Sequence, residues 1–298
     1  MWEITYKLIS VFLKNLNGMN VVVTGSAGFI GSRLCARLRA MGHHVIGLDK
    51  RTGGDAIHLK ALLAEHEIGV VYHLAAETSV FNTRLKDILR ENIEVLIEVV
   101  TACNEYGVKL VWASSSTANP CNTTSMYGMS KHFGEQFSMA YNPTATAVRL
   151  HNVYGPNPRP GTLLHHLLHD ERCTIFNEGR NVRHFTYIDD IVDALIMAST
   201  CNKPLVNAAN PELSTVREFC EEVAKHMHLN LDYVEQLRAR DNYEQAVDKG
   251  VYTMPVKYRS IAAGLADVFR TLKTGEPISH SHFDWLGQYQ ASISRGFH

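Results

Sequence analysis

The chain has 298 residues, of which 45% are hydrophobic and 20% are charged, proportions typical of a soluble globular protein with one large or two unequal domains. Its 29 basic and 30 acidic residues nearly cancel, so no global field attracts nucleic acid or an anionic membrane, and we expect neither as a partner. The six cysteines show no CxxC spacing, which argues against a zinc site and favours reduced thiols in a cytoplasmic protein.

Residues 1–18 differ from the rest of the chain. Their apolar positions are interrupted by Lys7 and Lys14, and no small-residue cleavage site follows, so neither a signal peptide nor a membrane span fits. Met19 stands directly before the first predicted strand as a second possible start. We expect an N-terminal extension or leader here, and a docked amphipathic helix is the open alternative.

The first strongly patterned segment is a strand, a glycine-rich turn and a helix. Val21–Val23 form the continuous apolar run of a buried parallel strand. Gly25 permits a tight turn, Gly28 allows a backbone to approach a pyrophosphate, and Gly31 allows the following helix, Arg33–Met41, to pack on the strand. The free amides at that helix N-terminus predict a dinucleotide diphosphate site.

A second strand, His44–Leu48, ends in Asp49. This residue lies roughly 20 positions past the turn, where a carboxylate accepts hydrogen bonds from the adenosine ribose hydroxyls. Lys50 and Arg51 stand beside it and could bind a 2′-phosphate, but the Asp49 carboxylate repels such a group. The sequence therefore favours NAD over NADP as the cofactor.

Strands and helices continue to alternate to residue 150. We expect helices over about 57–67, 83–106 and 125–141 and strands over 69–76, 108–113 and 145–150. This alternation predicts an α/β fold with a Rossmann-like, doubly wound parallel sheet, whose ligands lie beyond the carboxyl ends of the strands. We assign 19–151 to an NAD-binding domain, to which segments around 182–210 return, and 152–298 mainly to a smaller substrate-binding α/β domain.

Tyr127 and Lys131 are four residues apart and share one face of the predicted helix. A nearby cation stabilises a phenolate, so we expect Lys131 to lower the pKa of Tyr127 toward a value useful for proton transfer. Ser116, at the end of the preceding strand, can hydrogen-bond the same phenol oxygen. An isolated pair of this kind is more often a surface feature, but its place in a dinucleotide fold favours catalysis.

With these motifs the chain resembles the extended short-chain dehydrogenase/reductases, specifically their nucleotide-sugar epimerase/dehydratase branch. The resemblance covers residues 19 to about 220 and rests on these stretches: 24–31 (TGSAGFIG), 73–76 (HLAA), 114–116 (SSS), 127–131 (YGMSK), 149–156 (RLHNVYGP) and 183–190 (RHFTYIDD).

The resemblance implies roles for individual residues. Tyr127 would be the catalytic acid/base, Lys131 would also hold the nicotinamide ribose, and Ser116 would polarise the sugar C4 oxygen. The implied NAD-binding set is Gly25, Ala27, Gly28, Phe29, Ile30, Gly31, Asp49, Lys50, Asp55, Leu74, Ala75, Ala76, Asn92, Ser114, Tyr127 and Lys131. The implied substrate-binding set is Thr78, Ser116, Asn152 and Arg183, of which Asn152 and Arg183 would hold the diphosphate. A surface ion pair of Arg183 with Asp189 or Asp190 is the alternative for that residue.

Several features depart from the family pattern. Asp49 precedes His73 by only 24 positions, so a strand and a loop are shortened or lost. Whether Asp55 makes the adenine contact of the family is therefore left open. Ser116 and Tyr127 are only 11 positions apart, which reduces the substrate-facing loop. Thr117-Ala118 stands where dehydratases of this family carry an Asp-Glu pair, which disfavours water elimination.

A group of three histidines and two basic residues near the C-terminus are weaker candidates for a role in the site. His165, His166 and His169 include an i, i+4 pair but lack a third ligand, so we interpret them as a solvated helix face and expect no metal. Lys257 and Arg259 are nearby candidates for the arginine-containing C-terminal substrate motif of the family, and neither is assigned.

We therefore expect an NAD-dependent epimerase acting on a nucleotide-diphosphate sugar, at C4 and through a transient 4-keto intermediate, as a cytoplasmic homodimer. A 4-keto-sugar reductase that consumes NAD(P)H and a non-catalytic dinucleotide-binding protein are the alternatives.

Overall fold

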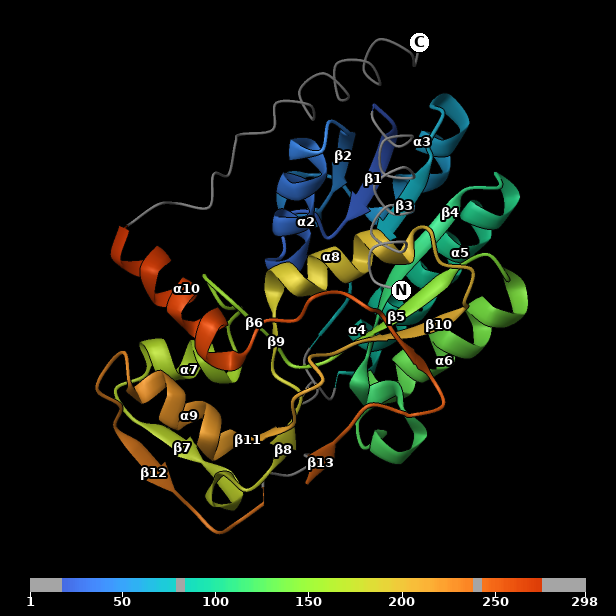
Figure 1. The fold of residues 1–298 in the computed structure, drawn as a ribbon. Helices are drawn as coiled ribbons and strands as arrows, with labels where there is room; N and C mark the ends of the chain where they lie inside the picture. The colour runs from blue at the N-terminus through green and yellow to red at the C-terminus, as the bar shows by residue number, and fades with distance from the viewer. Residues whose placement is uncertain (1–17, 79–83, 238–242, 275–298) are drawn as a thin grey trace.

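The computed structural model describes residues 18–78, 84–237 and 243–274 (Figure 1). Residues 1–17, and with them nearly all of the expected leader, lie outside the described residues. No helix in the described part of the chain is both long and apolar enough to cross a bilayer.

A sheet of seven parallel strands forms the centre of the molecule. Its order is β14-β10-β5-β4-β3-β1-β2, which confirms the predicted doubly wound α/β fold. The strands are β1 (Asn20–Thr24), β2 (His44–Leu48), β3 (Val70–His73), β4 (Lys109–Ser115), β5 (Thr146–Leu150), β10 (Leu205–Ala208) and β14 (Tyr252–Thr253).

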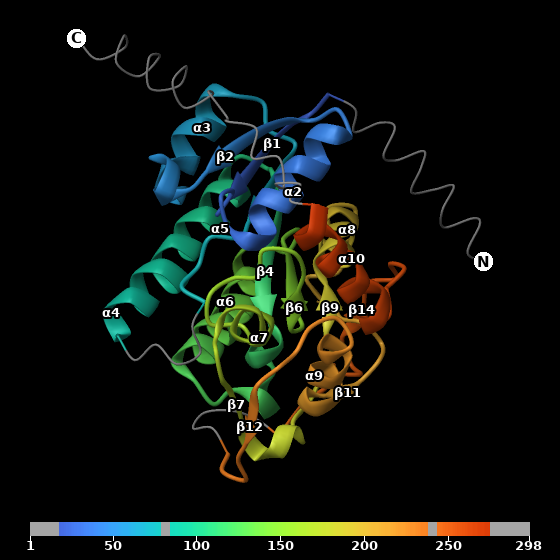
Figure 2. The ribbon, with the colours of Figure 1, turned by 90° about the vertical axis from the view of Figure 1, so that its left-hand side faces the viewer.

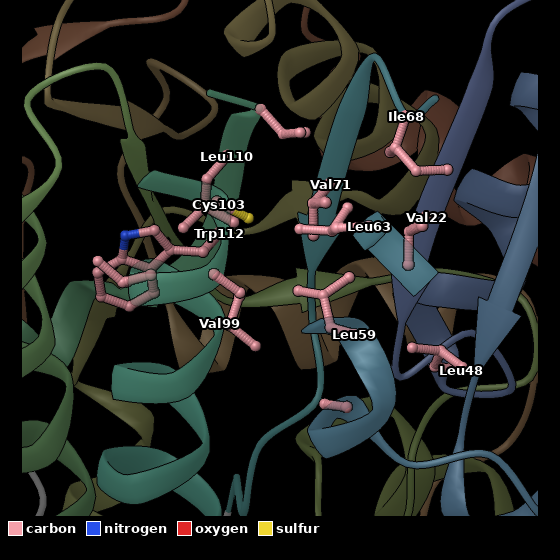
Figure 3. Close-up of a cluster of buried hydrophobic side chains, with 14 of the residues drawn as sticks. Val22, Leu48, Leu59, Leu63, Ile68, Val71, Val99, Cys103, Leu110 and Trp112 are labelled. Carbon is pink, nitrogen blue, oxygen red and sulfur yellow. The ribbon is translucent and has the colours of Figure 1, made fainter. Parts of the chain in front are cut away.

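Helices cover both faces of this sheet. On one face lie α3 (Leu59–Glu65), α5 (Val95–Glu105) and α6 (Met126–Tyr141), and Figure 3 shows Leu59 and Val99 directed at sheet residues such as Val71 and Trp112. On the other face, α2 (Phe29–Ala40) and α8 (Ile188–Ala198) bury a second apolar cluster against the strands. This burial on both faces explains the continuous apolar strands of the sequence.

The long helix predicted over 83–106 is interrupted. Its described part consists of α4 (Leu85–Ile88), a π-helical stretch (Leu89–Glu94) and α5. The wider π-helical turn carries Asn92, whose buried side chain hydrogen-bonds both backbone groups of Glu77. Such turns occur frequently where a helix contributes to a functional site.

Later elements gather toward one end of the sheet, most of them at the lower left of Figure 1 and the bottom of Figure 2, with the last helix nearer the middle of Figure 2. They are α7 (Leu163–His169), α9 (Val216–Ala224), α10 (Ile261–Thr274) and the short strands β6 (Val153–Tyr154), β7 (Cys173–Ile175), β8 (Val182–Arg183), β9 (Thr186–Tyr187), β11 (Ser214–Thr215), β12 (Leu231–Tyr233) and β13 (Glu244–Gln245). A third apolar cluster around Phe219 and Leu265 holds most of them together, and β11, β8 and β13 pair in a separate three-stranded sheet. β10 and β14 join the central sheet from beyond residue 152, and the division into two domains stays a prediction.

The chain between Asp49 and Gly69 is as short as the sequence indicated. It contains two 3₁₀ turns and α3 but no strand, and the structure describes every residue of it. β2 is therefore the edge of the sheet.

A buried ion pair joins α6 to the sheet. Arg149 of β5 donates from Nε and Nη2 to the two carboxylate oxygens of Glu135, at 2.8 and 2.7 Å, and Ser114 of β4 donates to the same carboxylate at 2.6 Å. The side chains of Glu135 and Arg149 are 0% and 4% exposed. Because both charges are removed from water, each depends on the other for compensation.

We expect Arg149→Met to lower the free energy of unfolding by about 3–5 kcal/mol, because the Glu135 carboxylate would be left buried without its partner. Urea unfolding at pH 7 measures the change. The matched control is Arg37→Met, which breaks the exposed pair with Asp193 and should cost no more than about 1 kcal/mol. Equal losses in the two variants would contradict a structural role for the buried pair.

Candidate active site

The glycine turn joins β1 to α2 and touches two neighbouring strand ends. Gly25 has a φ of +68°, and a Cβ there would lie 2.8 Å from the amide nitrogen of Ala75. A Cβ on Gly31 would lie 2.0 Å from the Gly25 carbonyl oxygen. Gly28 precedes α2 and has no side chain to cap it, so the first amides of the helix are left for a ligand. This cradle fits a dinucleotide diphosphate.

Asp49 follows β2 and is nearly buried. Its Oδ2 accepts from the Ala27 amide at 3.0 Å, and the Arg51 side chain donates to both carboxylate oxygens at 3.0 and 3.1 Å. Burial raises the pKa of Asp49, but the hydrogen bonds and charge of Arg51 and the Ala27 amide together lower it below its ordinary value. The carboxylate is therefore ionised. Ala27 does not line the active-site cavity; its backbone amide instead holds the Asp49 carboxylate in place.

Charged neighbours organise the loop after Asp49. Lys50 donates to Glu91 at 2.6 Å and lies 3.6 Å from Asp55. The Asp55 side chain accepts from the Ile57 amide and begins a 3₁₀ turn. Lys50 and Asp55 both line the cavity, and their contacts with a cofactor stay predictions.

Asn92 supports the site from behind. Its amide nitrogen donates to the Glu77 carbonyl at 2.9 Å and to Ser130 Oγ at 3.0 Å, and its oxygen accepts from the Glu77 amide at 2.8 Å. It thereby ties the segment after β3 to α6. Asn92 itself does not line the cavity.

Tyr127 and Lys131 lie at the start of α6, where the Ser125 hydroxyl accepts from the Gly128 amide and caps the helix. Lys131 Nζ donates to the Ala113 carbonyl at 2.8 Å and lies 5.8 Å from the centre of the Tyr127 ring. Burial lowers the pKa of Lys131 to about 8, and the charge of Glu135 opposes that shift.

The expected fall in the Tyr127 pKa is not what the structure gives. Burial raises the pKa of Tyr127, and a hydrogen bond with Ser115 and the charge of Arg159 only partly offset this. The expectation was wrong because it considered the effect of the Lys131 charge on the pKa but not the larger effect of removing the phenol from water. Ser115, and not the expected Ser116, is thus the serine whose side chain lowers the pKa of Tyr127, while the Ser116 hydroxyl donates to Gln245 Oε1 at 3.2 Å.

Asn152 and Arg183 approach from the later elements. Asn152 has a φ of 30°, and its buried Nδ2 has no hydrogen-bond partner within the described ranges. A buried donor of this kind fits an anionic ligand. Arg183 is also buried and donates to the Val182 and Tyr243 carbonyls.

The acidic pair after Arg183 has other partners. Asp189 pairs with Arg33 and Arg259, and Asp190 with Arg259. Of the two C-terminal candidates, Arg259 is thereby engaged, and neither it nor Lys257 lines the cavity.

One cavity of about 1090 Å³ brings most of these groups together. From the predicted set it is lined by Gly25, Gly28, Phe29, Ile30, Gly31, Asp49, Lys50, Asp55, Leu74, Ala75, Ala76, Thr78, Ser114, Ser116, Tyr127, Lys131, Asn152 and Arg183. Ser115, Arg159 and Gln245 also line it and were missed. No group of three potential metal ligands occurs in the described part of the chain.

The sequence holds some signal for Ser115 and Arg159 as residues that line the cavity, but none for Gln245. Ser115 stands in the same run of serines as Ser116, and Arg159 stands in the irregular segment after Gly155. Arg159 donates to Thr78 at 2.6 Å. Gln245 carries no sequence signal, because it reaches Ser116 across 129 positions.

Comparison with known proteins agrees with this geometry. Residues 21–208 match the family model described as NAD dependent epimerase/dehydratase family. An uncharacterised UDP-glucose epimerase of Bacillus subtilis is 30% identical over 225 residues, which are 59% of this chain and 71% of that protein. A putative UDP-glucose 4-epimerase of Methanocaldococcus jannaschii is 29% identical over 249 residues, 69% of this chain and 81% of that protein.

A solved structure gives the same result for the fold and the cofactor. The structure of MoeE5 in complex with UDP-glucuronic acid and NAD aligns with a TM-score of 0.74 at 25% identity. The alignment covers 86% of this chain and 99% of that one. The similarity therefore extends beyond the glycine turn to the later elements.

The low pKa of Lys131 predicts a dependence of stability on pH. An unfolded lysine titrates near roughly 10.4, so between the two pKa values the unfolded chain binds more protons and the stability contribution rises with pH. Relative to Lys131→Met, wild type should gain about 2 kcal/mol of unfolding free energy between pH 7 and 9.5, measured by urea unfolding. A pH-independent difference would sink this assignment, and Lys225→Met, on the exposed surface, is the control variant.

Proposed function

The chain belongs to the NAD-dependent epimerase/dehydratase family, and from that premise we propose that it inverts C4 of a UDP-sugar through a transient 4-keto intermediate. The observation that carries the proposal is the convergence of Tyr127, Lys131 and the serines at the end of β4 with the glycine turn on one cavity. The names of the relatives favour UDP as the nucleotide and C4 as the reacting carbon.

In this mechanism Tyr127 exchanges the proton of the C4 hydroxyl. Because burial raises its pKa, the phenol needs positive charge nearby to release its proton. Lys131, which is mostly charged below pH 8, and Arg159 supply that charge. Bound NAD supplies the hydride acceptor and donor for C4. Ser116 would hold the C4 oxygen, and inversion follows if the keto sugar turns its other face before the hydride returns.

Asn152 and Arg183 would bind the diphosphate. Asn152, whose Nδ2 has no partner among the described residues, and Arg183, whose guanidinium is buried, line the same cavity and can donate to phosphate oxygens. Holding the diphosphate apart from the sugar allows the sugar to rotate while the nucleotide stays in place. Dehydration is disfavoured, because Thr117 and Ala118 stand where an acid pair would be needed.

Purified protein should interconvert UDP-glucose and UDP-galactose, or the corresponding UDP-hexuronates, without net consumption of NAD or NADH. Product analysis by chromatography measures this, and a stoichiometric need for NAD(P)H would favour the 4-keto-reductase alternative instead. Tyr127→Phe is the matched control, since it keeps the ring but not the acid/base, and we expect its turnover to fall by about 10²–10⁴-fold. Unchanged turnover in this variant would contradict the role of Tyr127.

We also propose a homodimer. An apolar row runs along α6 at Met129, Phe133 and Tyr141, which are 62%, 41% and 46% exposed. Leu85 and Leu89 of the adjoining helical segment are 55% and 40% exposed. Exposed apolar residues grouped on neighbouring helices are typical of an interface.

We also propose the cytoplasm as the compartment. All six cysteines are free thiols, which supports it. Recovery of the protein outside the cytoplasm would contradict that assignment.

Light scattering should give the mass of two chains for wild type at micromolar concentration. Met129→Glu should shift the protein toward a monomer, because a buried unpaired carboxylate opposes association. The control Gln236→Glu adds the same charge at an exposed position shortly after β12, outside α6, and should leave the dimer intact. A monomeric wild type would overturn the dimer proposal.

A further inference from the structure

Gln245 lies in the cavity opposite the proposed catalytic strand end. It belongs to β13, which runs parallel to β8 and places Gln245 beside Arg183 in the register. The residue is 8% exposed and its Oε1 accepts from Ser116 Oγ at 3.2 Å. The contact joins the later elements directly to the end of β4.

The backbone after Gln245 is held firmly. The Val247 amide donates to His184 Nε2 at 3.2 Å, while His184 Nδ1 lies 2.6 Å from the Asn210 carbonyl oxygen. The Asn207 side chain donates to the Asp248 carbonyl at 3.3 Å, and Arg149 lies 3.5 Å from the Asp248 carboxylate. Anchored in this way, the Gln245 side chain is fixed relative to Ser116.

The carboxamide has unused hydrogen-bonding capacity. Its oxygen accepts from Ser116, whereas its nitrogen, with two N–H donors, has no partner within the described ranges and is not sealed from solvent. Sugar hydroxyls and keto oxygens are acceptors for such donors. The Ser116 hydroxyl directs its proton to the Gln245 amide oxygen, which leaves the Gln245 nitrogen to face the cavity.

We propose that Gln245 is a sugar-contacting residue: its amide nitrogen donates to a sugar oxygen of the substrate while its amide oxygen orients the Ser116 hydroxyl. The inference rests on the proposed function and deepens it. It assigns part of the recognition of the sugar, as distinct from the nucleotide, to a residue beyond the matched family region.

The test separates sugar binding from nucleotide binding. Calorimetry measures the Kd of UDP and of UDP-glucose or UDP-glucuronic acid for wild type, Gln245→Glu and Gln245→Met. Gln245→Glu keeps the shape but loses both N–H donors, and Gln245→Met removes both functions. We expect Gln245→Met to weaken binding of the UDP-sugar by about tenfold, the effect of one lost hydrogen bond, and to leave the affinity for UDP unchanged. Gln245→Glu adds a negative charge that also repels the diphosphate, so it should weaken binding of the UDP-sugar by more than it weakens binding of UDP. Glu244→Gln, at the exposed neighbouring position of β13, is the control and should change neither affinity.

A double-mutant cycle tests the link to Ser116. If Gln245 orients that hydroxyl, adding Gln245→Met to Ser116→Ala should weaken UDP-sugar binding by less than it does in wild type. Additive losses would contradict the positioning role, and unchanged UDP-sugar affinity in both Gln245 variants would contradict the sugar contact. Equal weakening of UDP and UDP-sugar would also overturn it, because that pattern indicates a loosened strand. If wild type does not epimerise UDP-sugars, the proposed function fails, but the binding measurements still test the contact of Gln245 with the sugar because they need no turnover.

Discussion

The buried pair of Glu135 and Arg149 is the interaction on which both the fold and the site depend. Lys131 and Glu135 are four residues apart, and so are Tyr127 and Lys131, so one face of α6 carries all three toward the sheet. Arg149 fixes the Glu135 end of that face to β5, and Ser114 fixes it to β4. The position of the Tyr127 phenol relative to the strand ends follows from this anchor.

The sequence predicts the part of the site that is local along the chain. The glycine turn, Asp49 and the Tyr127–Lys131 spacing are readable because each depends on one strand, one turn or one helical face. The strand run 21–23 and the strand 44–48 were found for the same reason, whereas the π-helical break after α4 was missed because helical periodicity does not register a single wider turn. Contacts across the chain were also missed: the environment of Tyr127 depends on burial and on Arg159, and Ser116 meets Gln245 only after folding.

The cavity contains several groups that carry a cost in stability. Lys131 is buried although burial disfavours its charge, Asn152 takes a left-handed backbone conformation with an Nδ2 that no described residue hydrogen-bonds, and Arg183 is withdrawn from water. These groups point donors or positive charge into one space. A bound diphosphate sugar and its cofactor would compensate them, so the site is organised for an anionic ligand before the ligand arrives.

The connection between Ser116 and Tyr127 is short, which limits what it could contribute to the proposed recognition of the sugar. Thr123 donates to the Thr117 and Asn119 carbonyls, and His132 Nδ1 lies 3.1 Å from the Ala118 carbonyl oxygen, so this connection folds onto itself and onto α6. The cavity wall that faces this connection is formed in part by Arg159 and by Gln245 of β13. Under the proposed function, the residues for proton transfer and cofactor binding lie before residue 208, whereas the proposed sugar contact, Gln245, lies after it. Such a separation would allow one reaction chemistry to serve different sugars through changes in a few late residues.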